Sequence, residues 1–288
     1  MPFTISHPAI VLPLKRLWPN WFSLSGLIAG AMSPDLLYFL LADTTWRGFS
    51  HSWSGLVLFC IPAGMLFSIV FHRLFKYEFI RHLPRPLECW LSGLAVSRFD
   101  LKTKRSWVIL ATSVLVGAMS HFFWDSFTHA AGQVASRIDF FLSEVTVLGY
   151  TSRVYRILQH GSSIGGALVI GLYFFFGSGL PSRARLPGER TVGRKIGFWL
   201  GAAVTSAAVA ALSLWVWASP GPEDFIPGHT RYMFIARVGL GTWAGLFHWT
   251  VWRALLLRSK QRDFADGNAI PVSSSVSGNQ PAGIQRDL

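Results

Sequence analysis

The chain has 288 residues, of which 51% are hydrophobic and only 14% charged, a composition too apolar for a soluble globular fold or a disordered chain. Lys and Arg exceed Asp and Glu to give a net charge of +12. The sequence contains no nucleic-acid-binding motif, so this excess indicates basic loops at an anionic membrane surface and no nucleic-acid partner. The composition therefore predicts an all-α, polytopic helical bundle embedded in the lipid bilayer.

Membrane crossing requires about 20 apolar helical residues. Five runs meet this length, and a shorter glycine-rich run gives a sixth. Lys and Arg gather after the second, fourth and sixth runs, which predicts alternating loops and a cytoplasmic C-terminus. The six expected spans are Trp21 to Leu41, Trp53 to Phe75, Trp107 to Thr128, Ser162 to Gly177, Ile196 to Ala218 and Tyr232 to Leu257.

The domain organisation follows from where polar residues occur. We expect one membrane-embedded domain over residues 1–262 and a disordered cytoplasmic tail over 263–288, which is rich in Ser, Gly, Asn and Gln. Within the domain, residues 1–178 carry nearly all the ionisable groups that fall in or near spans, whereas 196–257 have the character of packing helices. The first part is therefore where we expect a site.

The N-terminus predicts a short half-inserted helix. A helix from His7 to Arg16 descends about 13 Å, a turn follows at residues 18–20, and the next helix climbs about 17 Å from Leu24 to Asp35. His7 and Asp35 then reach a similar depth, so His7 is a candidate metal ligand. A surface or interfacial histidine is the alternative.

Asp35 lies deep in the first expected span, directly after Pro34. The proline removes a backbone donor and is expected to kink the helix. A carboxylate at this depth needs a cation, a proton or water, which makes Asp35 a candidate metal ligand and catalytic base. The alternative is a helix N-cap after a break at Pro34.

A histidine flanked by serines opens the second expected span. Ser50, His51 and Ser52 lie on the same membrane side as the end of the first span. His51 is therefore a candidate ligand, and Ser52 a candidate substrate-binding residue. The alternative is a helix cap by either serine, with no role for the histidine.

The third span carries a polar stripe. His121, Asp125 and His129 are spaced four residues apart, so they lie on one face of an α-helix. Imidazole and carboxylate at this spacing bind one divalent ion together, as the two histidines of the zincin helix do. The alternative is an interfacial helix end whose histidines bond to neighbours or water.

A last polar segment precedes the fourth expected span. Here His160 is a candidate ligand, while Gln159 and Ser162 are candidate donors to a bound oxyanion, that is, substrate-binding residues. The alternative is that Ser162 or Ser163 is the N-cap of that helix.

Five motifs occur in a characteristic order. The chain resembles a bacterial membrane-protein family of unknown function, number four-one-eight-four in that series, from its start to at least the fourth span. This resemblance implies a multi-pass protein of the bacterial inner membrane. The motifs are MPFTISHPA, GAMSPD, FSHSWSG, SHFFWDSFTHAAG and LQHGSS.

The chain is also similar, more distantly, to the LexA-regulated membrane-bound family of predicted metal-dependent hydrolases. It departs from that pattern at Leu36, where an acidic or polar group is common nearby, and by adding His129. The positions that match are His7, Pro34, Asp35, His51, Ser52, Ser120, His121, Asp125, Thr128 and Gly132.

The leading hypothesis is a membrane-embedded metal-dependent hydrolase with a divalent ion, zinc or alternatively manganese or iron. His121, Asp125 and His51 would hold one ion, and His7, His129 or His160 would complete that shell or hold a second ion. The order of ligands resembles the helical zinc-dependent phospholipase C and nuclease fold, and this resemblance implies phosphoester chemistry. The expected depth of the site, near the headgroups of the outer leaflet, favours a lipid or lipid-linked phosphoester as substrate. The alternatives are a non-catalytic metal-binding or ion-translocating protein, and a scaffold with structural histidines.

Overall fold

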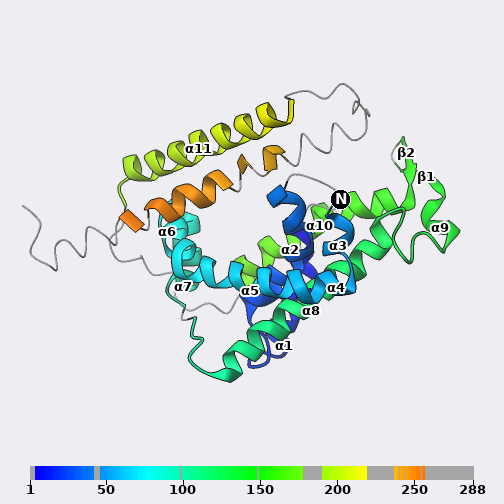
Figure 1. Ribbon diagram of the computed structural model, residues 1–288, viewed down its shortest axis with the longest axis horizontal. Helices are drawn as coiled ribbons and strands as arrows, with labels where there is room; N and C mark the ends of the chain where they lie inside the picture. Colours follow the sequence, from blue (N-terminus) through cyan, green and yellow to red (C-terminus); the bar gives the residue numbers. More distant parts are fainter. Residues whose placement is uncertain are drawn as a thin grey trace, which may run out of the picture.

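The structure is a computed structural model that describes residues 4–41, 46–97, 99–147, 149–177 and 190–218, and residues 237–256 apart from 240, 243 and 254. Within these ranges the chain is almost wholly helical, with one β-hairpin (Figure 1), which confirms the all-α prediction. The expected tail at 263–288 lies outside the described residues, as do both ends of the expected sixth span.

The N-terminal half contains several short helical segments and one long helix that runs from Trp53 to Arg81. This long helix alternates between α-helical and π-helical turns. The elements of this half are η1 (Thr4–Ile10), α1 (Leu12–Leu17), α2 (Leu24–Leu41), α3 (Arg47–Ser50), α4 (Trp53–Gly55), η2 (Leu56–Cys60), α5 (Ile61–Val70), η3 (Phe71–Phe75), α6 (Lys76–Arg81) and α7 (Arg85–Val96).

The second half has longer helices. Residues 237–256 are also helical where they are described. The elements are α8 (Lys104–Thr128), α9 (Asp139–Leu142), β1 (Glu144–Val147), β2 (Tyr150–Arg153), α10 (Val154–Leu172), η4 (Tyr173–Gly177) and α11 (Val192–Ala218).

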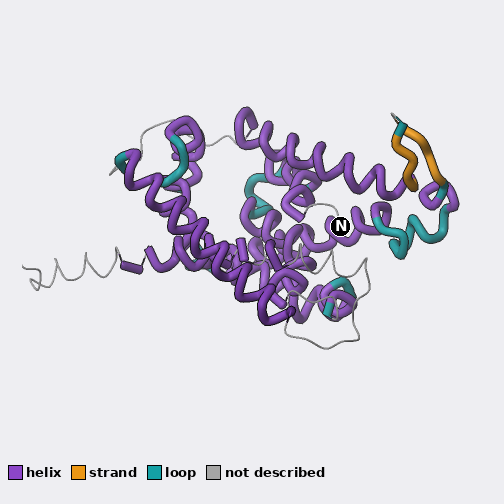
Figure 2. The backbone as a smooth tube through the Cα atoms, turned by 90° about the horizontal axis from the view of Figure 1, so that it is seen from above, coloured by secondary structure: helices purple, strands orange, loops and turns teal. Residues whose placement is uncertain are grey.

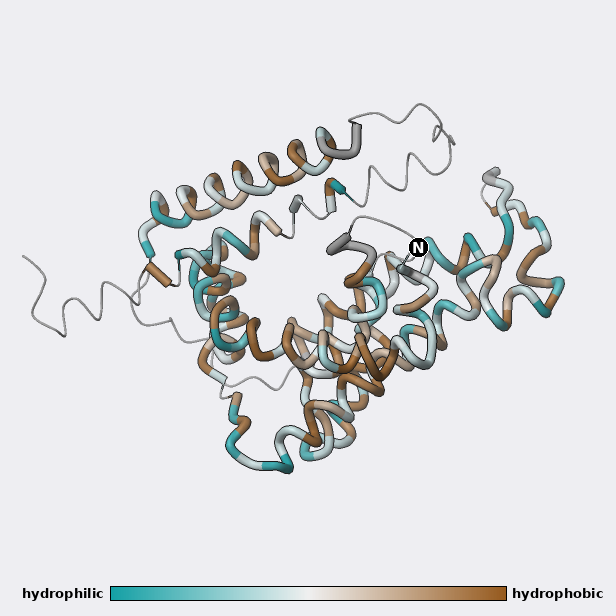
Figure 3. The backbone as a smooth tube through the Cα atoms, viewed as in Figure 1, coloured by the Kyte–Doolittle hydropathy of each residue, from teal (hydrophilic) through white to brown (hydrophobic). Residues whose placement is uncertain are grey.

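Several helices are apolar enough to cross a membrane, and α2 contributes a shorter apolar segment, Leu24–Leu37. Figure 3 shows hydrophobic residues along the central helices and hydrophilic ones at the hairpin and in the turn before α8. The chain is thus a helical protein of membrane type. The helices of spanning length in the described residues are Trp53–Arg81, Lys104–Thr128, Val154–Phe176 and Val192–Trp215.

The fourth span begins earlier than the sequence predicts. A two-stranded antiparallel hairpin, β1 with β2, turns at Gly149, whose φ of 81° suits a residue without a side chain. The helix α10 follows this hairpin directly from Val154, so Gln159 and Ser162 lie within it. The expected start at Ser162, and the alternative of a cap there, are therefore wrong.

Helices α2 and α8 pack closely at glycines. A Cβ on Gly30 would lie 2.7 Å from the Cα of Val114, and one on Gly117 would lie 2.7 Å from the backbone nitrogen of Ala31. Such small residues let two backbones approach in a membrane, where van der Waals contact drives association. This contact places Asp35 of α2 beside the polar stripe of α8.

We expect Gly117→Ala to lower the melting temperature of the detergent-solubilised protein. The added methyl group collides with the α2 backbone at Leu27 and Ala31 and forces α2 and α8 apart. Gly171→Ala is the matched control, because a Cβ at Gly171 meets nothing within 4 Å. Equal melting curves for the two variants would contradict this role of Gly117.

The N-terminal segment lies against α10. The hydroxyl of Ser6 donates a hydrogen bond to the backbone oxygen of Ser163 at 2.6 Å, and a Cβ on Gly166 would lie 2.8 Å from the backbone oxygen of Ser6. Figure 2, seen from above, shows the hairpin extending beyond this helical body. Because η1 is held between α10 and α2, its residue His7 is kept inside the protein.

The helix α11 contacts the turn between α6 and α7 and the first turn of α7. Lys195 forms an ion pair with Glu88, and its Nζ also donates to the backbone oxygen of Leu83 at 2.9 Å. The indole nitrogen of Trp199 donates to the backbone oxygen of His82 at 2.8 Å. These contacts join α11 to the segment that contains α6 and α7.

Candidate metal centre

Five ionisable side chains from separate segments meet near the contact of α2 with α8. His7 comes from η1, Asp35 from α2, His51 from the turn after α3, and His121 and Asp125 from α8. Asp35 and His121 are essentially inaccessible to solvent, at 1% and 0% exposure. The structure therefore brings together residues that are far apart in the sequence.

The orientation of His121 is fixed by the backbone of α2. Its Nδ1 lies 2.8 Å from the backbone oxygen of Ala31. A carbonyl oxygen only accepts, so Nδ1 carries a proton, which leaves Nε2 as the ring atom available to a metal. That Nε2 lies 3.4 Å from Oδ2 of Asp125 and 3.8 Å from Oδ1 of Asp35, in the position of a metal ligand.

His51 approaches the same two carboxylates from the other side. Its Nδ1 lies 3.1 Å from the hydroxyl of Ser50. Its Nε2 lies 3.5 Å from Oδ1 of Asp35 and 3.8 Å from Oδ2 of Asp125. Both histidines thus present Nε2 to the same pair of oxygens.

The nitrogen-to-oxygen distances among these four atoms approach those between the ligands of a tetrahedral ion. Among the described residues, the groups whose ligand atoms lie within 4.8 Å of one another are His7, His121 and Asp125, and Asp35, His51 and His121. Ligands about 2.0 to 2.2 Å from a tetrahedral ion are separated from one another by about 3.3 to 3.6 Å. The four nitrogen-to-oxygen distances between the two histidines and two aspartates span 3.4 to 3.8 Å. A small contraction around an ion would bring these distances into that range.

Polar atoms in this cluster are buried without a hydrogen-bond partner. Burying a polar group in this way costs about 1 to 3 kcal/mol, and more for a charged group, unless a partner or a metal satisfies it. A divalent cation would satisfy these nitrogens and oxygens together. Among the described residues they include Nδ1 and Nε2 of His7, Oδ1 of Asp35, Nε2 of His121 and Oδ1 of Asp125.

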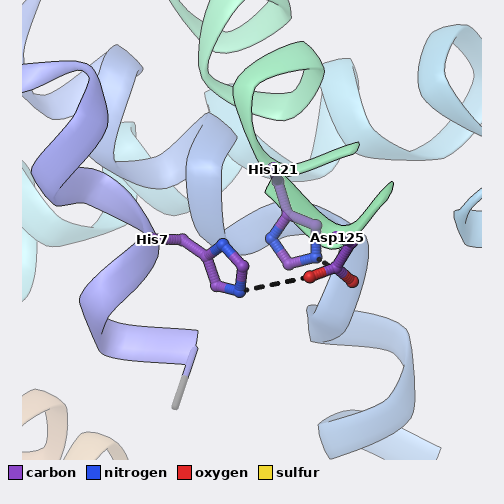
Figure 4. A group of neighbouring side chains, drawn as sticks. All are labelled: His7, His121 and Asp125. Carbon is purple, nitrogen blue, oxygen red and sulfur yellow. Dashed lines mark ion pairs between the residues drawn. The ribbon is translucent and has the colours of Figure 1, made fainter. Parts of the chain in front are cut away.

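His7 stacks on His121, with ring centroids 3.9 Å apart and an interplanar angle of 25°. Its Nε2 lies 3.7 Å from Oδ1 of Asp125, as Figure 4 shows. Burial, together with the neighbouring His121, lowers the pKa of His7 to about 3. The imidazole is therefore neutral at pH 7, which is the form that binds a metal.

His129 lies at the end of α8, beside the same carboxylate. Its Nδ1 is 3.5 Å from Oδ1 of Asp125 and 3.2 Å from the backbone oxygen of that residue. The side chains of His129, His51 and Asp125 are 13 to 17% exposed, whereas those of His7, Asp35 and His121 are at most 2% exposed. The cluster is therefore partly exposed on the side of His129 and His51 and closed at His7, Asp35 and His121.

The other residues that the sequence predicts for the site have different surroundings from those of the cluster. His160 is exposed on α10 and belongs to neither group of possible metal ligands found among the described residues. Gln159 and Ser162 are inside that helix, where the hydroxyl of Ser162 donates to the backbone oxygen of Gln159. Ser52 is the N-cap of α4 and accepts from the backbone nitrogen of Gly55, as the cap alternative predicts.

Asp35 is not a helix cap, because α2 continues without a break through Pro34. The sequence pattern does not predict Thr4 as a partner of Asp35. The Thr4 hydroxyl donates to Oδ2 of Asp35 at 2.6 Å. This bond leaves Oδ1 facing the histidines. The only signal for Thr4 is its place in the motif that also holds His7.

We expect Thr4→Val to reduce metal affinity by about 10- to 100-fold, because outer groups that orient a ligand contribute on this scale. The change removes the hydroxyl that holds Oδ2 of Asp35 and keeps the shape of the side chain. Thr112→Val is the matched control, since the Thr112 hydroxyl is exposed and bonds within its own helix. Metal titration of the detergent-solubilised variants measures the difference. Equal affinities would contradict the orienting role.

The fold and the cluster together define a helical membrane protein with His and Asp groups able to hold a metal ion. Residues 1–253 match the family model described as Domain of unknown function (DUF4184), and the chain belongs to that family. This agrees with the resemblance carried by the five motifs. Comparison with curated proteins and with solved structures gives no significant match.

Proposed function

We propose that the protein is a membrane-embedded, metal-dependent hydrolase. The observation that carries the proposal is the four-atom set of Asp35, His51, His121 and Asp125, whose spacing suits a tetrahedral ion. Two imidazoles and two carboxylates favour zinc, with manganese and iron as alternatives. An ion held by three of these side chains, with its fourth position open, would lower the pKa of a bound water to about 7 and polarise a substrate oxygen.

The protein groups around the cluster support this chemistry. The Ala31 backbone oxygen holds His121 in its ligating tautomer, and Thr4 holds Asp35. The inner wall of the cluster is closed to water at His121 and Asp35, while its outer side is partly exposed. A substrate therefore enters past His129 and His51, toward groups that are already oriented.

The substrate we propose is a lipid or a lipid-linked phosphoester. The helices that carry the cluster are apolar enough to cross a bilayer, so a lipid substrate reaches them by lateral diffusion. The distribution of Lys and Arg supports an inner-membrane protein with a cytoplasmic C-terminus, and we propose that the opening faces the outer leaflet. The bilayer then surrounds the protein and also supplies its substrate.

The test is hydrolysis by purified protein in detergent, before and after metal removal. We expect cleavage of lipid phosphoesters that stops on chelation and returns with zinc or manganese. The His160→Ala variant is the control, because His160 is exposed outside the cluster and its loss leaves activity unchanged. Tight metal binding without cleavage of any phosphoester would contradict the hydrolase and favour a non-catalytic metal-binding or ion-translocating protein.

A further inference from the structure

The two oxygens of Asp125 face different sets of histidines. Oδ2 lies near Nε2 of His121 and of His51, within the four-atom set. Oδ1 lies 3.7 Å from Nε2 of His7 and 3.5 Å from Nδ1 of His129. These two distances fall in the same range as those of the four-atom set. The carboxylate therefore stands between two groups of nitrogen ligands.

A single ion at the four-atom set does not explain why the His7 side chain is buried. His7 is 4% exposed, and both of its ring nitrogens are buried without a hydrogen-bond partner. Oδ1 of Asp125, toward which Nε2 of His7 points in Figure 4, is also buried without one. An ion bound to the four-atom set takes its ligands from other atoms. It would therefore leave the ring nitrogens of His7 and Oδ1 of Asp125 without a partner.

We propose that a second divalent cation binds between Oδ1 of Asp125, Nε2 of His7 and Nδ1 of His129, with Asp125 bridging the two ions. This inference rests on the proposed function and deepens it. The contact of His129 Nδ1 with the backbone oxygen of Asp125, at 3.2 Å, is the hydrogen bond that ion binding replaces. Paired ions in hydrolytic sites stand about 3.5 to 4 Å apart, a separation that a bridging carboxylate suits.

The two ion positions differ in their openness. The first lies against Asp35 and His121, the most buried side chains of the cluster, whereas the second has three ligands and keeps a position for water or a substrate oxygen. The second position also includes His129, whose side chain is 17% exposed, so it faces the opening. We therefore assign the substrate oxygen to the second ion.

Charge also favours an anionic substrate at a two-ion centre. Asp35 and Asp125 supply two negative charges, and neutral imidazoles supply none, so one divalent ion leaves the cluster neutral. A second ion gives it two positive charges, which a phosphoester or hydroxide balances. On this assignment Asp35 is a buried ligand of the first ion. The residue that bridges the two ions is Asp125.

The stoichiometry of bound metal tests this inference. Purified, metal-stripped protein in detergent is titrated with zinc, and bound ions are counted by elemental analysis after removal of free metal. We expect two ions per chain in the wild type and in the His160→Ala control, and one in His7→Ala. A second variant, His129→Ala, should also bind one. Melting curves confirm that each variant is folded.

The outcomes separate the two proposals. One ion in the wild type overturns the second site and leaves the hydrolase proposal standing, whereas no ion overturns both. Two ions in folded His7→Ala overturn the assignment of His7 as a ligand of the second ion. Manganese-loaded protein gives an independent reading, because two bridged manganese ions produce a spin-coupled resonance spectrum. That coupling should be present in the wild type and absent from His7→Ala.

Discussion

Asp125→Ala is expected to lose all tightly bound metal and all metal-dependent hydrolysis. The two oxygens of this carboxylate lie 3.4 to 3.8 Å from nitrogens of four histidines, more than any other described residue of the cluster contacts. Its removal takes a ligand from every ion position at once. A ligand present at 1,000 times its Kd stabilises a protein by about 4 kcal/mol. Zinc at such a concentration should raise the melting temperature of the wild type and should no longer raise that of Asp125→Ala.

The control for this experiment is Asp139→Ala, which removes an exposed carboxylate from α9. That variant should respond to zinc as the wild type does. An Asp125→Ala protein that is folded and still stabilised by zinc would contradict the central position of Asp125. Asp125→Glu provides a further check, since its carboxylate is retained but displaced by one methylene, and weakened binding is the expected result.

Asp35→Asn is expected to reduce hydrolysis by at least about 100-fold, beyond the 10- to 100-fold effect typical of outer groups. The change preserves the shape of the side chain and removes the charge that Nε2 of His51 and of His121 face at 3.5 and 3.8 Å. The amide still accepts from Thr4, so the fold should be retained. The measurement is the initial rate of phosphate release at saturating metal.

Asp35→Asn also separates an enzyme from a scaffold. If Asp35 only ties helices together, the variant should show lower stability and unchanged chemistry. If it holds an ion, the rate should fall while the melting curve of the metal-free protein stays close to that of the wild type. Unchanged hydrolysis in the variant would contradict any catalytic or ligating role for Asp35.

Spacing in the sequence accounts for how the helical residues of the cluster come together. The intervals of four residues from His121 to Asp125 and His129 set one face of α8, and the packing of α2 on α8 brings Asp35 to that face. The N-terminal turn explains how His7 comes near the cluster. In each case local periodicity and helix length determine the position.

Other features depend on contacts that spacing does not encode. Pro34 does not break α2, because neighbouring groups in a membrane helix can compensate for a missing donor. Ser162 and Ser163 resemble a cap, yet their hydroxyls bond back to Gln159 inside α10. The bonds from Thr4 to Asp35 and from His121 to Ala31 join distant segments, so only the tertiary structure reveals them.

The most direct measurement of the metal centre is X-ray absorption at the metal edge of the purified, untagged protein in detergent. We expect bound metal with nitrogen and oxygen ligands at about 2.0 to 2.2 Å, the scattering pattern of imidazole, and no sulfur ligand. The neighbouring-ion signal should appear at about 3.5 to 4 Å. Protein that carries no metal under conditions where it is folded, or metal bound through sulfur, would contradict a centre built from histidines and aspartates.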